Sequence, residues 1–407
     1  MKVLGIETSC DETAVCLIEA HGTFGDAFSF KVLGNTLISQ AALHAQFGGV
    51  FPNLAKREHA KNLVPILARC LREAGISEGG YSDISPYKDS LEKILEREPG
   101  LYEQFSEFVQ KHERPNVDVI AVTHGPGLEP ALWVGVNFAR ALSIVWNIPI
   151  VPVNHMEGHL VLPMMEITED RHSHILKNMR TSGRLRSFEF PVLALLISGG
   201  HTELVLSKSF GEYEILGQTR DDAVGEAFDK VARLLDLPYP GGPEISRLAT
   251  EARISGFTKS RYVLPRPMMH EDNFDFSFSG LKTAVRKIVE NHQGDASLDF
   301  KRQLAREFED TVADVLVAKT LRAVDAYGAN TILVGGGVSA NTYIRVRLAE
   351  AIKGAGDIVT LLMPPPELST DNAIMIALAG YFRALEKDFA DLVTLQARGN
   401  LKISQKA

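Results

Sequence analysis

Two histidines four positions apart, His155 and His159, have the residue type and spacing that most directly suggest chemistry in this chain. They follow an apolar run over residues 148–153, and residues four apart lie on one face of a helix. Both imidazoles could therefore bind one metal ion. A zinc protease needs a glutamate directly after the first histidine, but Met156 holds that position. The pair indicates a metal site without a protease base; two surface or helix-capping histidines are the alternative.

The chain repeats an order of elements, and this repeat predicts the framework around the histidine pair. An apolar strand over residues 3–7, a polar turn and a strand over residues 13–19 have a later counterpart. That counterpart is a strand over residues 193–197, a Ser-Gly-Gly turn and a strand over residues 202–207. Two such β-hairpins, each opening about half of the chain, predict an internal duplication.

A strand followed by a glycine loop and a helix also occurs twice, at residues 124–127 and at residues 335–341. Backbone N–H groups of such loops bind phosphate in α/β proteins. Four turns in matching order therefore predict two α/β halves that face one nucleotide cleft. Helices are expected over residues 221–235 and 298–327, and the last major helix is expected to begin at Asp371.

Two segments interrupt this order and are interpreted as insertions, residues 77–115 and residues 167–190. The first is polar and charged and contains three prolines. The second carries basic side chains with no acid between the first and the last of them: Arg171, Lys177, Arg180, Arg184 and Arg186. An RNA-facing loop and a solvated loop are both consistent with such a run of charge.

The composition is that of a globular protein with an acidic balance. Hydrophobic residues make up 45% and charged residues 23% of the 407 residues, so two or three domains are expected. The formal net charge of −8 argues against binding of nucleic acid through overall charge, but it allows a local basic patch. Cys10, Cys16 and Cys70 have unrelated spacings, which indicates neither a disulfide framework nor a cysteine zinc site.

The start of the chain has no pattern of a targeting segment. Met1-Lys2 leads directly into a strand-like apolar run, and no apolar stretch reaches the roughly 18 residues of a membrane span. We therefore expect a cytoplasmic protein with no membrane partner. A bacterial cytoplasm fits better than an organelle, although a processed organellar protein would have the same sequence features.

Seven motifs in order along the chain together resemble the TsaD family, once called O-sialoglycoprotein endopeptidases. The resemblance extends from Gly5 to about Leu378, apart from the two insertions. It departs from the usual residues of the family at Asn53 and within residues 127–133. The motifs are the histidine pair and residues 5–13, 196–202, 225–230, 239–242, 276–283 and 336–341.

The resemblance implies an α/β fold of two duplicated lobes, of the actin/hexokinase/Hsp70 (ASKHA) type, with a cleft between the lobes. The N-terminal lobe is expected over residues 1–150, with the insertion 77–115, and is completed by a C-terminal helix over residues 371–400. The second lobe is expected over residues 151–370, with the insertion 167–190.

The resemblance also implies a reaction. The threonylcarbamoyl group of threonylcarbamoyl-AMP would pass to N6 of adenosine 37, in tRNAs that read codons beginning with adenine, to form N6-threonylcarbamoyladenosine. The expected partners are tRNA, a paralogous inactive protein (TsaB-like) and a small P-loop ATPase (TsaE-like). A separate synthase would make the adenylate.

The same resemblance implies that His155, His159 and Asp371 bind one divalent metal ion per chain. Two histidines and a carboxylate with open positions suit iron and also allow zinc. Without the resemblance, Asp371 would be interpreted as a helix N-cap. The open positions could polarise the threonylcarbamoyl group.

An adenine nucleotide, threonylcarbamoyl-AMP or ATP, is expected along a second set of residues. The Ser-Gly-Gly turn would hold the phosphate end, Asp229 the ribose hydroxyls and Asn341 the adenine, while Gly242 would let the backbone approach the sugar. A tight hairpin, a solvated acid and a helix N-cap are the simpler interpretations of these residues. The set is Leu196, Ile197, Ser198, Gly199, Gly200, Asp229, Gly242 and Asn341.

Asp11 and Glu12, in the first polar turn, are the candidate catalytic residues. They would orient the acyl donor or the incoming amine, because an adenine N6 amine is a poor nucleophile. Paired carboxylates at a turn are otherwise solvated or capping. Cys10 is interpreted as a small packed residue.

Three alternatives compete with this interpretation. A small-molecule kinase of the same ASKHA fold would bind ATP but would have no need of the histidine pair. A metalloprotease is disfavoured because no glutamate follows His155 directly. A non-catalytic scaffold would be expected to lose the metal and nucleotide residues, which this chain retains.

Overall fold

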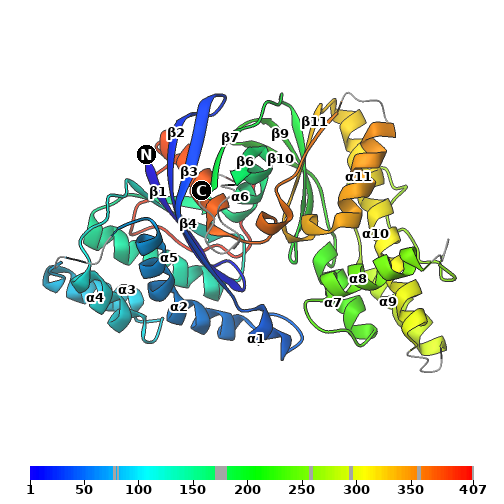
Figure 1. The fold of residues 1–407 in the computed structure, drawn as a ribbon, viewed down its shortest axis with the longest axis horizontal. Coiled ribbons are helices and arrows are strands. Elements are labelled where there is room, and N and C mark those ends of the chain that lie inside the picture. Colours follow the sequence, from blue (N-terminus) through cyan, green and yellow to red (C-terminus); the bar gives the residue numbers. More distant parts are fainter. Residues whose placement is uncertain are drawn as a thin grey trace. The chain divides into compact units, whose positions relative to one another are not determined.

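The computed structural model describes residues 1–76, 79, 82–169, 181–255, 260–292, 297–354 and 359–405 (Figure 1). The chain divides into two compact units. Unit 1 comprises residues 1–44, 50–186 and 371–407, and unit 2 comprises residues 45–49 and 187–370. No helix in the described ranges is long and apolar enough to cross a membrane.

Unit 1 is built on a seven-stranded sheet in the order β5-β4-β1-β2-β3-β7-β6. The pairs β1–β2 and β2–β3 are antiparallel, whereas β1, β4 and β5 run parallel. Continuous apolar sequence makes the parallel strands suited to burial on both faces. The strands are β1 (Lys2–Glu7), β2 (Glu12–Thr23), β3 (Asp26–Ser39), β4 (Val119–Gly125), β5 (Ile150–Asn154), β6 (Met165–Glu169) and β7 (Thr181–Leu185).

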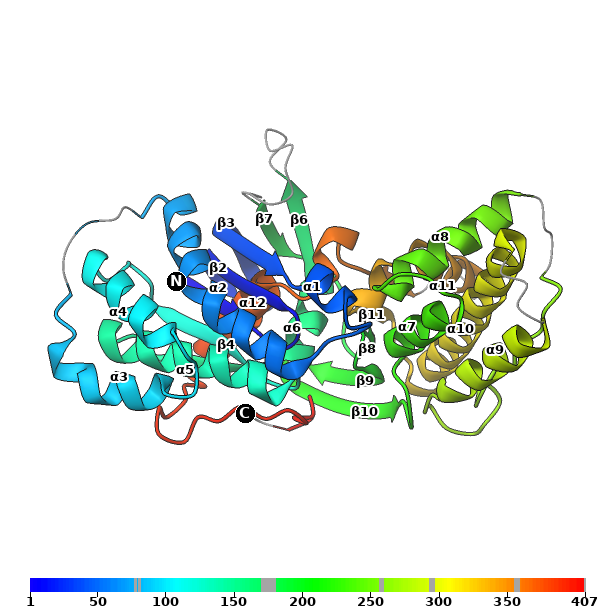
Figure 2. The same cartoon turned by 90° about the horizontal axis from the view of Figure 1, so that it is seen from below.

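Helices cover both faces of the unit 1 sheet (Figure 2). Leu4 and Ile6 of β1 pack in one core with α2 and α5, while Gly5, between them, meets the backbone of Ala373 and Ala377 in α12. This alternation follows from the two-residue period of a strand. The helices of unit 1 are α1 (Ala41–Ala45, whose last residue belongs to unit 2), α2 (Pro52–Glu73), α3 (Lys88–Leu95), α4 (Leu101–Lys111), α5 (Glu129–Trp146), α6 (His155–Val161) and α12 (Ala373–Leu385).

Unit 2 contains a five-stranded sheet in the order β10-β9-β8-β11-β12. The strands β8, β9 and β10 form an antiparallel meander, and β8, β11 and β12 run parallel. The strands are β8 (Val192–Ile197), β9 (Thr202–Ser209), β10 (Glu212–Gln218), β11 (Thr331–Gly335) and β12 (Thr360–Leu362). The helices are α7 (Val224–Leu234), α8 (Gly241–Ile254), α9 (Ser279–Asn291), α10 (Leu298–Tyr327) and α11 (Thr342–Gly354).

The two sheets confirm the predicted duplication. The order β3-β2-β1-β4-β5 in unit 1 corresponds to β10-β9-β8-β11-β12 in unit 2, with the same strand directions. Both predicted hairpins form, and the helix expected over residues 298–327 has those bounds. The α/β fold class is therefore the expected one.

The unit boundaries differ from the expected lobes. The N-terminal lobe was expected to end at residue 150, but unit 1 continues to Arg186. The reason is that β5 pairs in parallel with β4, and β7 pairs with β3. The expected C-terminal helix over residues 371–400 ends at Leu385, and residues 386–405 continue along unit 1 without regular helix or strand. Backbone contacts with the sheet hold this tail: the N–H of Ala390 donates to Ile150.

The first predicted insertion folds as packed helices. Leu91, Leu95 and Phe105 of α3 and α4 are buried in the core of unit 1. The Phe105 ring meets Phe138 of α5 edge to face, with centroids 6.0 Å apart. The described residues of this segment therefore belong to the packed core of unit 1.

The second predicted insertion contains β6 and β7, which extend the unit 1 sheet beyond β3. Arg184 on β7 is exposed and pairs with Glu166 at 2.6 Å. Arg186 donates to the Met165 carbonyl at 3.0 Å. The remaining basic residues of the run, Arg171, Lys177 and Arg180, lie outside the described residues.

Candidate metal centre and nucleotide turn

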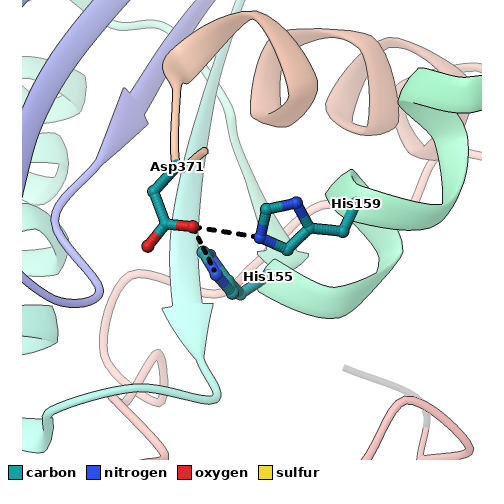
Figure 3. A group of neighbouring side chains, drawn as sticks. All are labelled: His155, His159 and Asp371. Atoms are coloured by element: carbon teal, nitrogen blue, oxygen red, sulfur yellow. Dashed lines mark hydrogen bonds and ion pairs between the residues drawn. The ribbon is translucent and has the colours of Figure 1, made fainter. Parts of the chain in front are cut away.

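His155, His159 and Asp371 converge at one point of unit 1 (Figure 3). Nε2 of His159 lies 3.0 Å from Oδ1 of Asp371, and Nε2 of His155 lies 3.4 Å from the same oxygen. One potential ligand atom from each residue lies within 4.8 Å of the other two. The two imidazoles are nearly buried, and the carboxylate is 17% exposed. The predicted ligand set is therefore brought together across more than 200 residues of sequence.

Local sequence explains the direction of each ligand. Asn154 caps α6 by accepting hydrogen bonds from the N–H groups of Met156 and Glu157. His155 is thus the first helical residue, and His159 follows one turn later on the same face. The sequence position of Asp371 had suggested that it caps α12, but it does not. The Asn372 side chain accepts from the N–H of Met375 and takes that role.

Glu7 is the residue of this site that the sequence patterns missed. It ends β1, and its Oε2 lies 3.0 Å from Nδ1 of His155 while accepting a hydrogen bond from the Thr123 hydroxyl at 2.7 Å. Because β1, β4 and β5 are adjacent and parallel, Glu7, Thr123 and the helix after β5 meet at the carboxyl ends of the strands. The sequence feature that could have identified Glu7 is its position two residues after Gly5, on the same face of an apolar strand.

The electrostatics of the centre favour a positive charge. Burial alone would raise the pKa of Asp371 and of Glu7, but the charge and hydrogen bond of His155 hold both below their usual values. Burial alone would lower the pKa of His155, but the two carboxylates raise it well above its ordinary value. Two buried carboxylates around two imidazoles are a chemically suitable environment for a divalent cation.

Helices α6 and α12 approach closely beside this centre. A Cβ atom on Gly158 would lie 3.1 Å from Met375 Cγ and 3.2 Å from Ile376 Cδ1. Glu157 forms a two-contact ion pair with Arg383 of α12, at 2.8 and 3.0 Å. The carboxylate nearest in sequence to the histidines therefore pairs with an arginine.

Asp11 lies in the turn that follows Glu7, and Glu12 is the first residue of β2. Oε1 of Glu12 accepts from the Ser39 hydroxyl at 3.1 Å. Burial raises the pKa of Glu12 well above its ordinary value, and the negative charges of Asp11 and then Asp371 add to this rise. The turn therefore lies within electrostatic reach of the candidate metal ligand Asp371.

Burial and the neighbouring Asp11 also raise the pKa of the Cys10 thiol, in keeping with a packed, unreactive side chain. His59 of α2 contacts the backbone of this turn: its Nε2 lies 2.9 Å from the Cys10 carbonyl oxygen.

The candidate nucleotide turn belongs to unit 2. Leu196 and Ile197 are buried at the end of β8, and the turn after them leaves Gly199 and Gly200 exposed. The Ser198 hydroxyl accepts from the N–H groups of Gly200 and His201, so the turn is also a stable hairpin. The first residues of α7 pack directly against it: the N–H of Gly225 donates to the Ser198 carbonyl at 3.2 Å.

Asp229 holds the start of α8. Its Oδ1 accepts from the N–H of Gly241 at 2.7 Å. A Cβ on Gly241 would lie 2.4 Å from the Cβ of Ala232, whereas a Cβ on Gly242 would meet nothing within 4 Å. Close packing therefore requires the glycine at position 241, and position 242 borders open space.

Asn341 caps α11, which was the simpler of its two interpretations. Its Oδ1 accepts from the N–H of Ile344 at 3.0 Å, and its amide donates to Ser246 and Glu309, both at 2.8 Å. Asn341 thereby joins α8, the helix that begins at Gly241, but none of these contacts joins it to Asp229.

The glycine loop over residues 124–127 is not an anion site, contrary to the sequence expectation. The N–H of Gly127 donates to the Gly399 carbonyl, and the N–H of Leu128 donates to Ser9. A Cβ on Gly125 would lie 2.1 Å from the Arg398 carbonyl oxygen. These glycines therefore accommodate the C-terminal tail, which occupies the place that a phosphate would need.

Comparison with known proteins identifies the family of the chain. The family model of TsaD, tRNA N6-adenosine threonylcarbamoyltransferase, matches residues 31–84 and 109–378. The match leaves out residues 85–108, which lie within the first predicted insertion, and it includes the second predicted insertion. The tRNA N6-adenosine threonylcarbamoyltransferase of Chromobacterium violaceum is 40% identical over 404 residues, which cover 98% of each chain.

A solved structure shares the fold at low identity. The crystal structure of full-length HypF in the phosphate- and nucleotide-bound form matches with a TM-score of 0.51 and 12% identity. The match covers 96% of this chain and 47% of that chain. The family match and the close relative lead to one conclusion: this chain belongs to the TsaD family of tRNA N6-adenosine threonylcarbamoyltransferases.

Proposed function

We propose that this acyltransferase, whose family modifies N6 of an adenosine in tRNA, uses a metal centre at His155, His159 and Asp371. The convergence of these three side chains on one point carries the proposal. Two imidazole nitrogens and one carboxylate leave coordination positions open, a donor set that suits iron and allows zinc. A bound metal would act as a Lewis acid toward the carbonyl oxygen of the threonylcarbamoyl group.

The carboxylates of the first turn would handle the incoming amine. The adenine N6 nitrogen attacks the carbamoyl carbon of threonylcarbamoyl-AMP, a C–N bond forms, and the C–O bond to the phosphate breaks with AMP as the leaving group. The amine loses one proton in this step. Asp11 and Glu12 would orient the amine, and one of the two carboxylates would accept this proton.

Unit 2 would hold the nucleotide part of the donor, threonylcarbamoyl-AMP, or ATP. In the exposed turn at residues 198–200, the N–H of Gly199 would donate to phosphate, because those of Ser198 and Gly200 already donate to the His201 carbonyl and the Ser198 hydroxyl. Asp229 would offer a carboxylate to ribose hydroxyls. Gly242 borders open space where a sugar could lie close to the backbone. Asn341 would reach adenine only by exchanging part of its present hydrogen bonding.

We further propose a cytoplasmic assembly with a TsaB-like partner and a TsaE-like ATPase. The overall charge of −8 supports the need for help with tRNA, because a polyanion binds poorly to an acidic surface. A partner protein or the basic run between Arg171 and Arg186 would supply the positive surface.

The test is transfer of labelled threonine into unmodified tRNA, with ATP, bicarbonate, a synthase and candidate partners. Wild type is compared with His159→Ala and, as a matched control, with His270→Ala, since His270 is exposed in unit 2. We expect label with wild type and the control. For His159→Ala we expect loss of label and of stoichiometric metal, measured by elemental analysis.

Full metal retention in purified His159→Ala would refute the ligand assignment. Absence of label with every partner set, together with phosphorylation of a small molecule, would instead support the kinase alternative.

A further inference from the structure

We propose that Glu7 is a positioning residue of the metal centre, which holds the His155 ring so that its Nε2 faces the metal. The inference rests on the metal centre of the proposed function. Glu7 is not among the predicted ligands, and its carboxylate contacts His155 on the side of the ring away from Asp371: Nδ1 of His155 faces Glu7, and Nε2 faces Asp371.

The contacts of Glu7 determine which ring nitrogen carries hydrogen. Oε2 accepts from the Thr123 hydroxyl and lies 3.0 Å from Nδ1 of His155, and Oε1 accepts from the N–H of Ser9. An ionised carboxylate only accepts hydrogen bonds, so Nδ1 of His155 donates to it. A metal that replaces the proton on Nε2 then leaves hydrogen on Nδ1, so the lone pair of the neutral ring points at the metal.

The position of Glu7 in the fold makes this contact rigid. Glu7 is fully buried at the end of a central strand, and its neighbours come from the adjacent parallel strand β4 and from the helix that follows β5. A carboxylate in such a place is unfavourable unless its oxygens are satisfied. Here donors satisfy both oxygens, so the side chain has one orientation and transmits it to the imidazole.

The contact also affects the strength of the ligand. A carboxylate that accepts from the far nitrogen of a metal-binding imidazole makes the near nitrogen more basic and fixes the ring plane. Removing such a partner typically weakens metal binding about 10- to 100-fold. Glu7 is therefore expected to set how tightly the centre holds its ion, without contacting the ion.

The decisive variant is Glu7→Gln, which keeps the side-chain shape but has only one accepting oxygen. Whichever way the amide turns, Nδ1 of His155 loses its charged acceptor, because it then faces either an NH2 group or a neutral carbonyl oxygen. We expect Zn²⁺ to dissociate from Glu7→Gln about 10- to 100-fold faster into a chelator than from wild type. Thr123→Val is the matched control, because it removes a donor to the same oxygen and keeps the His155 contact; its rate should stay within about threefold.

A second measurement uses wild type, so it does not depend on the folding of a variant. In the Zn²⁺-loaded protein, nitrogen-15 NMR of the histidine side chains should show hydrogen on Nδ1 of His155 and metal on Nε2. Metal on Nδ1, or equal Zn²⁺ dissociation rates for Glu7→Gln and wild type, would overturn the role of Glu7. Failure of wild type to bind stoichiometric metal would instead overturn the proposed metal centre itself.

Discussion

Several side chains of the candidate nucleotide site also hold the protein together. Asp229 accepts from the backbone of Gly241, and Asn341 caps a helix while it bridges Ser246 and Glu309. Removal of either side chain would disturb the fold and any bound nucleotide at once. Alanine variants therefore cannot separate the two roles, and substitutions that keep the structural hydrogen bond are needed.

Asp229→Asn meets this requirement. Its amide oxygen can still accept from Gly241, but hydrogen bonds to a charged acceptor are stronger than those to a neutral one by roughly 1 kcal/mol. We expect about fivefold to tenfold weaker binding of AMP or ATP by calorimetry, and a melting temperature only about 2–4 °C lower, because the Gly241 bond also loses its charged acceptor. Glu226→Gln on the same helix is the control, since its carboxylate is half exposed and pairs with Lys230. Unchanged affinity in Asp229→Asn would argue against the ribose role.

At the scale of elements, the candidate metal centre depends on the contact between α6 and α12. One helix carries both histidines, and the other begins just after Asp371. The absence of a side chain at Gly158 lets the helices approach, and the Glu157–Arg383 pair joins them. Because Glu157 is buried, loss of its partner should cost much more than loss of a surface pair.

Arg383→Met is therefore expected to lower the free energy of unfolding by about 3 kcal/mol, measured in urea with the metal removed by chelator. The control is Glu386, an exposed carboxylate that also pairs with Arg383, at 3.2 Å. Glu386→Gln should lower the free energy of unfolding by less than about 1 kcal/mol. Equal effects of the two substitutions would mean that the buried pair does not stabilise the helix contact.

At the scale of the molecule, the duplicated sheets place different chemistry in the two units. The carboxyl ends of β1, β4 and β5 in unit 1 adjoin the candidate metal ligands Asp371 and His155, whereas the end of β8 in unit 2 leads into the Ser-Gly-Gly turn. The candidate metal ligands all belong to unit 1, and the candidate nucleotide residues all belong to unit 2. A bound metal should therefore stabilise mainly unit 1, and a bound nucleotide mainly unit 2.

Hydrogen exchange measured by mass spectrometry checks this expectation. Zn²⁺ at about 100 times its dissociation constant should protect amides of α6 and the start of α12 by up to about 2.7 kcal/mol. An adenine nucleotide should protect the turn at residues 198–200 and α7. His159→Ala should abolish the first effect and keep the second. Protection by Zn²⁺ centred on unit 2 would contradict the assignment.

Much of the local structure followed from the sequence alone. Apolar strands with polar turns predicted both hairpins, helical periodicity predicted residues 298–327, and the i and i+4 spacing predicted that His155 and His159 share a face. Such features depend on neighbouring residues and on the short periods of helix and strand, so a linear pattern contains them. The family's motifs added the fold class and Asp371 as a candidate metal ligand.

Only the tertiary structure decided which distant residues meet. The pairing of β1 with β4 and β5 brings Glu7 to His155, and the path of the tail places Arg398 and Gly399 on a glycine loop that would otherwise resemble an anion site. Contacts of this kind depend on strand order and on packing between elements far apart in the chain. A sequence pattern identifies a buried carboxylate or a crowded glycine, but the fold alone determines its partner.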